Sequence, residues 1–244
     1  MDVASVFPHR ISILTGHYGV GKTEVCVNLA MALARAGVSG RLALADLDIV
    51  NPYFRSRERR DVLEAAGVEV ISSSPACSDA DIPSLPPQLL SILQDRDIRG
   101  LLDIGGDPVG ARVLARFAPQ IQQEDHVLYC VINANRPEVS TKETATRYLH
   151  AIEEVTSLRC GGLINNTHLC DETTADAILK GAELCAAVST MTGAPVVCHV
   201  AKEELMPALS GLGEPILPMT VYMRKPWERP AAPAIGPLRT RAGR

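Results

Sequence analysis

A glycine-rich segment near the start of the chain constrains the fold more than any other feature. Residues 16–23 read G-H-Y-G-V-G-K-T and match the pattern G-x-x-x-x-G-K-[ST] at every defined position. An apolar run at residues 11–14 precedes this segment, and a helical pattern over residues 22–36 follows it. Glycines allow sharp turns and a close approach of the backbone to phosphate, and the start of a helix attracts anions. We therefore predict a strand, a phosphate-binding loop and a helix that bind a nucleoside triphosphate with Mg²⁺.

The patterns along the rest of the chain predict the fold class. Short apolar runs alternate with longer helical patterns, which is typical of βαβ units and a mainly parallel sheet. We predict a three-layer α/β fold in one domain, residues 1–222, with a mainly parallel central sheet flanked by helices. Residues 223–244 are rich in proline and arginine and predict a disordered tail, or alternatively a basic docking tail. Strands are predicted at residues 10–14, 41–45, 68–71, 100–104, 126–133, 160–165 and 195–200, and helices at 22–36, 56–66, 88–94, 110–117, 140–157 and 172–192.

Composition and charge narrow the classes of function. The net charge of −4 and the pI near 5.9 provide no global basic field, so we expect no dedicated nucleic-acid surface. No apolar run reaches the ~18 residues of a membrane span, so no membrane anchor is expected. The start of the chain also lacks the pattern of a secretory signal. The seven cysteines include no C-x-x-C pair and several lie in apolar runs, so we expect a cytoplasmic protein with free thiols.

The residue types within the loop predict the roles of its side chains and backbone. Lys22 is expected to bridge the β- and γ-phosphates, and the hydroxyl of Thr23 is expected to bind Mg²⁺. Backbone amides of the loop and of the first helical turn would contact the phosphates. The residues assigned to the nucleotide here are Gly16, His17, Tyr18, Gly19, Val20, Gly21, Lys22, Thr23 and Glu24.

The loop and the helix after it resemble a known family. Residues 19–34 read G-V-G-K-T-E-V-C-V-N-L-A-M-A-L-A and closely resemble the start of the MinD/ParA/CobQ-like P-loop ATPases. Those proteins typically read GVGKT, a short gap, then VNLA and ALA. The resemblance covers most of residues 10–210, and outside the motifs it is architectural only. It implies the P-loop NTPase fold, with ATP and Mg²⁺ as cofactors.

Acidic residues at two predicted strand ends fit the motif order of this family. Ligands of α/β sheets lie at the carboxyl ends of the strands. After the strand L-A-L-A-D-L-D, the resemblance assigns Asp48 to orient the attacking water and to lie near the metal, with Asp46 as the alternative. After L-L-D-I-G-G-D, it assigns Asp103 to the metal through water. Asp107 matches the spacing D-x-x-G-D of the nitrogenase iron-protein branch, and its role stays open.

Two further segments are candidates for nucleotide and partner contacts. The predicted strand at residues 160–165 ends in a pair of asparagines, and in this family such an amide commonly reads adenine. An amide carries both a donor and an acceptor, which suits a purine, so either Asn165 or Asn166 could fill this role. Residues 49–57 contain aromatic residues and arginines after a proline turn. This segment is either a nucleotide-dependent switch or a helix entry with solvated arginines.

Departures from the family leave the physiological role open. MinD and ParA proteins carry a signature lysine where this chain has His17, and Tyr18 replaces the usual second glycine, so dimerisation across the nucleotide is in doubt. Our first hypothesis is an ATPase that acts as a nucleotide-dependent switch or assembly factor for an unidentified protein partner, with a homodimer possible. The alternative is a carboxylate-activating enzyme of the dethiobiotin synthetase or cobyrinate amidase type. A non-catalytic ATP sensor is the third hypothesis.

Overall fold

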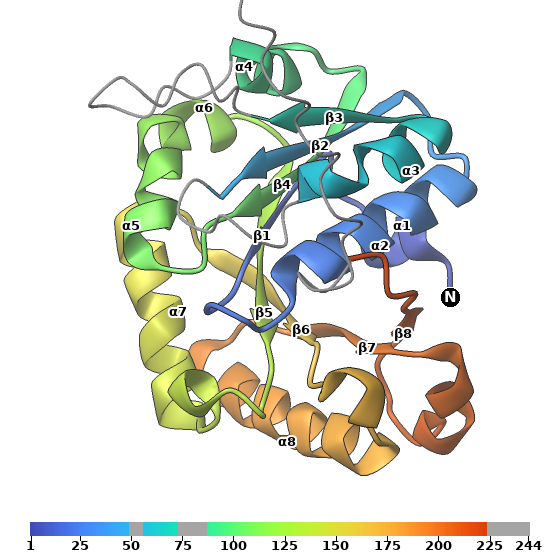
Figure 1. Cartoon of the computed structure of the whole chain (residues 1–244). Coiled ribbons are helices and arrows are strands. Elements are labelled where there is room, and N and C mark those ends of the chain that lie inside the picture. The colour runs from blue at the N-terminus through green and yellow to red at the C-terminus, as the bar shows by residue number, and fades with distance from the viewer. Residues whose placement is uncertain (49–55, 73–86, 224–244) are drawn as a thin grey trace, which may run out of the picture.

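One parallel sheet forms the frame of the molecule. In a computed structural model, which describes residues 1–48, 56–72 and 87–223, the strands lie in the order β3-β2-β4-β1-β5-β6-β7-β8 (Figure 1). Every pairing between these strands is parallel. The strands are β1 (Ile11–Thr15), β2 (Arg41–Leu47), β3 (Val68–Ser72), β4 (Ile98–Ile104), β5 (His126–Ile132), β6 (Cys160–Asn165), β7 (Val196–Ala201) and β8 (Ile216–Pro218).

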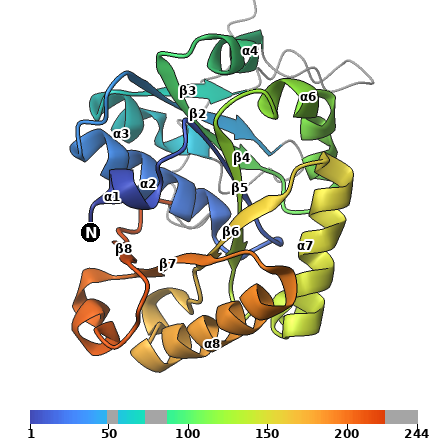
Figure 2. The ribbon, with the colours of Figure 1, turned by 180° about the vertical axis from the view of Figure 1, so that it is seen from behind.

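Helices cover both faces of this sheet, which gives three layers. Right-handed crossovers place α2 and α3 on one face and α4 to α8 on the other, an arrangement visible from opposite sides in Figures 1 and 2. The α-helices are α1 (Val3–Val6), α2 (Lys22–Arg35), α3 (Arg60–Ala65), α4 (Pro87–Gln94), α5 (Pro108–Ala111), α6 (Ala118–Ile121), α7 (Lys142–Thr156) and α8 (Ala175–Thr192). Short 3-10 helices are η1 (Ser56–Arg59), η3 (Arg112–Arg116), η4 (Pro137–Val139), η5 (Cys170–Glu172) and η6 (Glu203–Leu209).

The hydrophobic core lies on both sides of the sheet. Leu29 and Leu33 of α2 pack with one face, and Leu89 and Ile92 of α4 pack with Ile152 of α7 on the other. All five residues of β1 are buried, as expected for a central parallel strand that is covered twice. The continuous apolar runs in the sequence therefore become interior strands, and the polar loops at their carboxyl ends are left to form a site.

The predicted elements agree with the structure in order and type, with local differences. The helix predicted at residues 56–66 begins as η1 before it becomes α3, and the one at 110–117 is divided into α5, η3 and α6. Pro108 and Pro119 each lie at the start of a short helix, where the missing N–H costs nothing, and so divide this region. The prediction assigned neither the helix α1, which Asp2 caps, nor the strand β8.

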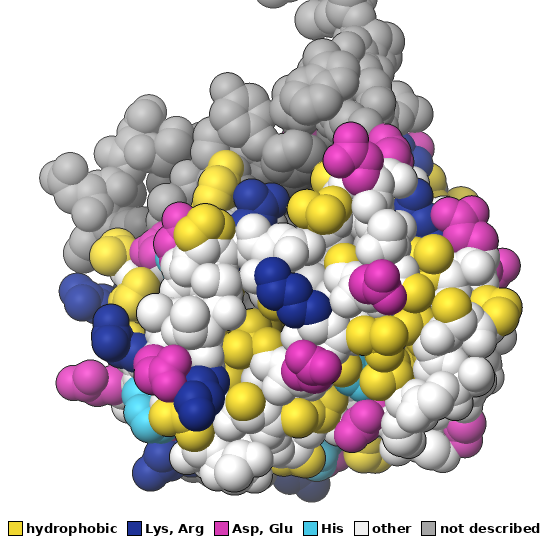
Figure 3. All heavy atoms as spheres, turned by 90° about the horizontal axis from the view of Figure 1, so that it is seen from below, with side chains coloured by type: hydrophobic (Ala, Val, Ile, Leu, Met, Phe, Trp, Pro, Cys, Tyr) yellow, Lys and Arg dark blue, Asp and Glu magenta, His cyan; other side chains and the backbone are white. Residues whose placement is uncertain are grey.

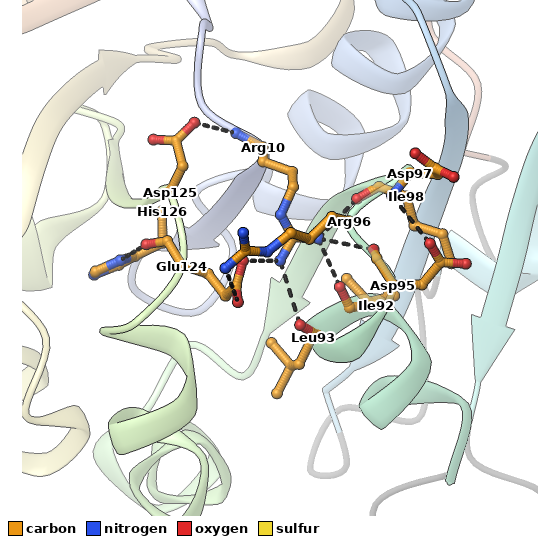
Figure 4. A network of polar contacts seen from close by, with 10 residues as sticks. All are labelled: Arg10, Ile92, Leu93, Asp95, Arg96, Asp97, Ile98, Glu124, Asp125 and His126. Atoms are coloured by element: carbon orange, nitrogen blue, oxygen red, sulfur yellow. Dashed lines mark hydrogen bonds and ion pairs between the residues drawn. The ribbon is translucent and has the colours of Figure 1, made fainter.

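Arg10 ties together the amino ends of the strands, opposite the phosphate loop. Its guanidinium donates hydrogen bonds to the carbonyls of Ile92, Asp95 and Ile98 at 2.8 to 3.2 Å. It also pairs with Glu124 at 2.8 Å, as Figure 4 shows. These carbonyls include the orphan groups that end α4, so one partly buried cation caps a helix and joins it to β1 and β4.

The carboxyl end of the described chain is clamped onto α2. The carboxylate of Glu24 accepts backbone N–H groups from Tyr222 at 2.7 Å and Met223 at 3.1 Å. Asn28 exchanges two further hydrogen bonds with the backbone of Thr220. Met223 is buried against the core, one residue beyond the predicted end of the domain at 222. We call residues 220–223 the clamped segment; the rest of the predicted tail lies outside the described residues.

Two expectations from composition can be compared with this structure. Within the described ranges, no helix is long and apolar enough to cross a membrane. The six cysteines of those ranges are free thiols, namely Cys26, Cys130, Cys160, Cys170, Cys185 and Cys198. Burial raises the pKa of the thiol of Cys26, and the same cause raises that of Cys185 to about 12, so these residues act as small hydrophobic groups.

Candidate functional site

The glycine-rich loop joins β1 to α2 in a conformation that requires its glycines. Gly19 and Gly21 have positive φ angles of 77° and 85°, which L side chains rarely adopt. A Cβ on Gly16 would lie 2.5 Å from the carbonyl oxygen of Val131 in β5. Gly21 caps α2 without any side-chain hydrogen bond, so the first amides of a 14-residue helix lack a partner from the cap. This end of α2 could therefore hold an anion with backbone groups.

The loop after β4 lies directly against the phosphate loop. A Cβ on Gly106 would lie 2.7 Å from Nζ of Lys22 and 3.0 Å from the backbone nitrogen of Tyr18. Lys22 is only 6% exposed, so its ammonium group is held inside the site. Gly106 therefore leaves the space that allows the two predicted motifs to meet around one cation.

Three predicted carboxylates converge beside this lysine. Asp46 and Asp103 are register partners on β2 and β4, and Asp48 follows the end of β2. All three are buried, and Asp103 is 1% exposed. Burial, and after it the negative charge of Asp46, raise the pKa of Asp103 to about 7 against the lowering effect of Lys22. The site therefore holds more negative charge than its own cation neutralises.

This donor set fits Mg²⁺ as the sequence predicted. Neither carboxylate oxygen of Asp103 makes a hydrogen bond of standard geometry with a described residue, although the Thr23 hydroxyl lies near enough to lower its pKa. Across residues 1–48, 56–72 and 87–223, no three His, Cys, Asp or Glu residues form a complete metal-binding group. Mg²⁺ does not need one, because it usually takes one or two protein ligands and completes its shell with water and phosphate. Thr23, Asp48 and Asp103 would hold the ion.

The two asparagines after β6 have different roles in the structure. Asn165 is saturated by protein groups: its Nδ2 donates to Ile178 O and to Nδ1 of His199, and its Oδ1 accepts the N–H of Thr167. Asn166 donates from Nδ2 to the carbonyl of Val20 in the phosphate loop at 2.8 Å. Its buried Oδ1 finds no donor in the described part of the chain. Of the two predicted residues, only Asn166 lies at the loop with an acceptor to offer.

Other predicted residues have contacts that their sequence positions do not reveal. The carboxylate of Glu24 holds the clamped segment, so this side chain points to the carboxyl end of the chain, and only its backbone amide is left for a nucleotide. Asp107 caps α5 by accepting the N–H of Gly110 at 2.8 Å. The ring of His17 meets Tyr148 edge to face at 5.6 Å, and Tyr18 is 61% exposed. The predicted switch-like segment lies largely at residues 49–55, outside the described residues.

The sequence analysis missed two basic residues that flank the loop. Arg136, after β5, donates from Nε to the carbonyl of Gly19 at 2.7 Å. His168, after β6, lies 3.1 Å through Nε2 from where a Cβ on Gly21 would be. Burial lowers the pKa of His168, and the charge of Arg136 lowers it further. The available signal was their position just after two buried strands, since the carboxyl ends of all parallel strands meet at one edge of the sheet.

Comparison with known proteins establishes the fold. No family model matches the chain, and a search of curated proteins finds no match. Among solved structures, chloroplast FtsY from Physcomitrella patens aligns with a TM-score of 0.50 and 16% identity, over 76% of this chain and 56% of that one. The signal recognition particle 54 kDa protein from Aeropyrum pernix K1, in complex with GDP, aligns with a TM-score of 0.48 and 22% identity. This alignment covers 77% of this chain and 40% of that one. FtsY from Mycoplasma mycoides aligns with a TM-score of 0.47 and 16% identity, over 76% of this chain and 58% of that one.

These similarities concern the fold alone, because the identities are low. The chain spans between 40% and 58% of the length of the three proteins. The predicted fold class is confirmed: a mainly parallel sheet flanked by helices, in the three-layer arrangement of P-loop NTPases. The narrower resemblance to MinD, ParA and CobQ stays a prediction from the sequence.

Proposed function

We propose that this protein binds Mg·ATP at residues 16–23, hydrolyses it, and acts as a nucleotide-dependent switch or assembly factor for a protein partner. One observation carries the proposal. The uncapped start of α2 and the buried ammonium of Lys22 lie beside strand-end carboxylates on β2 and β4. Amides and an ammonium group suit phosphate oxygens, and carboxylates near a hydroxyl suit Mg²⁺.

The chain's own groups have separate roles in hydrolysis. Lys22 would bind the β- and γ-phosphates and stabilise the charge that develops on the phosphoryl oxygens. Asp48 would orient a water molecule whose oxygen bonds to the γ-phosphorus as the bond to the bridging oxygen breaks. Bound Mg²⁺ supplies further positive charge to the phosphates. Thr23 and Asp103 would hold that ion together with Asp48, and the space that Gly106 leaves beside Lys22 would take the terminal phosphate.

Recognition of the base is the second part of the proposal. The Oδ1 of Asn166 is a buried acceptor at the phosphate loop, and the amino group of adenine is a matching donor. We therefore propose ATP as the preferred nucleotide, and Asn165 is removed from this role because its amide is saturated by protein groups.

The surroundings of the loop support a protein partner. Three large hydrophobic residues are exposed near the carboxyl edge of the sheet: Tyr18 and Leu169 on loops, and Val109 in the short helix α5. Figure 3, which views that end of the molecule, shows hydrophobic side chains gathered over its middle among scattered basic and acidic ones. Such a mixed surface suits a protein contact better than a nucleic-acid contact. A second copy of the chain is one candidate for this partner.

Nucleotide titration with three variants tests the proposal. Wild-type protein should bind Mg·ATP more tightly than Mg·GTP, and Lys22→Ala should weaken binding at least tenfold. Asp48→Asn should retain binding and lose at least tenfold in phosphate release, and Asp97→Asn, on the exposed opposite edge, should match wild type in both. Absence of binding by the wild type would refute the proposal. Phosphate release that needs an added carboxylate metabolite would instead identify the alternative, a carboxylate-activating enzyme.

A further inference from the structure

We propose that Arg136 is a second cation of the phosphate site, which contacts the terminal phosphoryl group of a nucleoside triphosphate bound in the same chain. The inference rests on the proposed function and adds a residue that no motif in the sequence marks. Its basis is the contact between the guanidinium of Arg136 and the phosphate loop at Gly19.

The guanidinium lies directly against the loop. Its Nε donates to the carbonyl of Gly19 at 2.7 Å, and a Cβ on Gly19 would lie 3.0 Å from Cζ and 3.3 Å from Nη2 of Arg136. Two separate reasons therefore favour glycine at position 19. Its φ of 77° is rare for other residues, and the arginine occupies the space that a side chain would take.

This contact is at the end of the loop where the terminal phosphate would lie. Gly106 approaches both the ammonium of Lys22 and the backbone nitrogen of Tyr18, and a lysine at this position of the motif reaches the β- and γ-phosphates. Gly19 is the residue that follows Tyr18. Arg136 therefore joins the loop next to the residues that would surround a γ-phosphate.

The side chain of Arg136 is held at one end and available at the other. Its backbone N–H donates to Asn133 O and its carbonyl accepts the N–H of Val139, so the turn after β5 is fixed on both sides. The side chain is exposed, and in the described part of the chain no carboxylate pairs with it and no acceptor binds its terminal amines. Those amines can donate in parallel to phosphoryl oxygens, the geometry for which arginine is suited.

The phosphate loop itself carries little positive charge. Position 17 is a histidine whose ring packs on Tyr148, so Lys22 is the only lysine or arginine within residues 16–23. Burial lowers the pKa of His168, on the Gly21 side of the loop, and the positive charge of Arg136 lowers it further, so the guanidinium is close enough to act on a neighbouring group of the site.

The experiment compares affinities for a non-hydrolysable Mg·ATP analogue and for Mg·ADP. Arg136→Gln keeps a donor for Gly19 O and removes the charge, and Arg136→Ala removes both. Both variants should lose at least tenfold in affinity for the analogue and less than threefold for ADP. Arg147→Ala, an exposed arginine of α7, should match wild type for both ligands, and thermal melts should show that each variant is folded.

The outcomes separate this inference from the proposed function. Equal losses for the two ligands would show that Arg136 only supports the loop, and would overturn the inference. Wild-type affinity of Arg136→Gln for the analogue would overturn it as well. If wild-type protein binds neither ligand, the proposed function fails, and the inference fails with it. Rescue of phosphate release in Arg136→Ala by added guanidinium at low millimolar concentration, without any effect on wild type, would support the inference independently.

Discussion

Replacement of Asp103 by asparagine should stabilise the protein when nucleotide and metal are absent. The carboxyl group is buried, and its pKa is raised from 3.8 to about 7 by burial and by Asp46. Ionisation therefore takes place in the unfolded chain at a lower pH than in the folded protein. The wild type loses stability as pH rises from about 4 to about 7, and the loss is complete above that range.

The size of the effect follows from the shift. A rise from 3.8 to about 7 is about three units, and each unit corresponds to about 1.4 kcal/mol, so ionised Asp103 destabilises the metal-free fold by as much as about 4 kcal/mol. Asp103→Asn carries no charge at any pH. The variant and the wild type should have similar free energies of unfolding near pH 4. The stability of the variant relative to the wild type should then increase steadily up to pH 7.

Urea denaturation in the presence of a chelator, in half-unit steps from pH 4.5 to pH 8, measures this difference. Asp97→Asn, at an exposed position, is the matched control and should show no such trend. A stability difference between Asp103→Asn and wild type that is the same at every pH would refute the reasoning, because it would show that Asp103 is ionised in the folded protein throughout. Mg·ATP should reverse the order, since it binds the ionised site of the wild type better.

Three further substitutions test contacts that hold the fold together. Arg10→Ala should lower the free energy of unfolding by about 2 to 3 kcal/mol in urea, because Glu124 and several carbonyls lose a partly buried cation; an unchanged midpoint would contradict this. Glu24→Ala should lower the free energy of unfolding by about 2 to 3 kcal/mol, because two backbone N–H groups lose their acceptor. Hydrogen exchange should become faster in the clamped segment and stay unchanged at the amides of β5. Gly181→Ala should lower the melting temperature and cost at least about 2 kcal/mol, since its Cβ would lie 2.0 Å from a buried hydroxyl. Gly213→Ala meets nothing within 4 Å and is the control.

The fold could be predicted from the sequence because the patterns that specify it lie within short segments of the chain. Continuous apolar runs mark the interior strands of a parallel sheet, and the spacing of the glycines with Lys22 and Thr23 places one loop between β1 and α2. Parallel topology then brings the ends of β2 and β4 to the same edge, so Asp46 and Asp103 become neighbours without any contact having been predicted.

The remaining features depend on contacts between distant parts of the chain. Arg136 meets a loop residue that is 117 positions away, and no periodicity reports such a pair. Asn165 and Asn166 are identical in chemistry, and only the direction of each side chain at the end of β6 assigns one to the core and the other to the loop. Glu24 matches the loop by position, yet its carboxylate binds a segment almost two hundred residues later.

The two side chains that hold the phosphate loop have a consequence for the rate of nucleotide binding. Arg136 and Asn166 bind the consecutive carbonyls of Gly19 and Val20 before any ligand arrives. Fixing the backbone of one residue has an entropic free-energy cost of about 1 to 2 kcal/mol. Here the loop is already fixed in the folded protein, so nucleotide binding does not carry that cost. Association should therefore be a single fast step whose rate varies with salt, not a slow one limited by loop rearrangement. Substitutions that loosen the turns after β5 and β6 would then slow association without removing any atom that contacts the nucleotide.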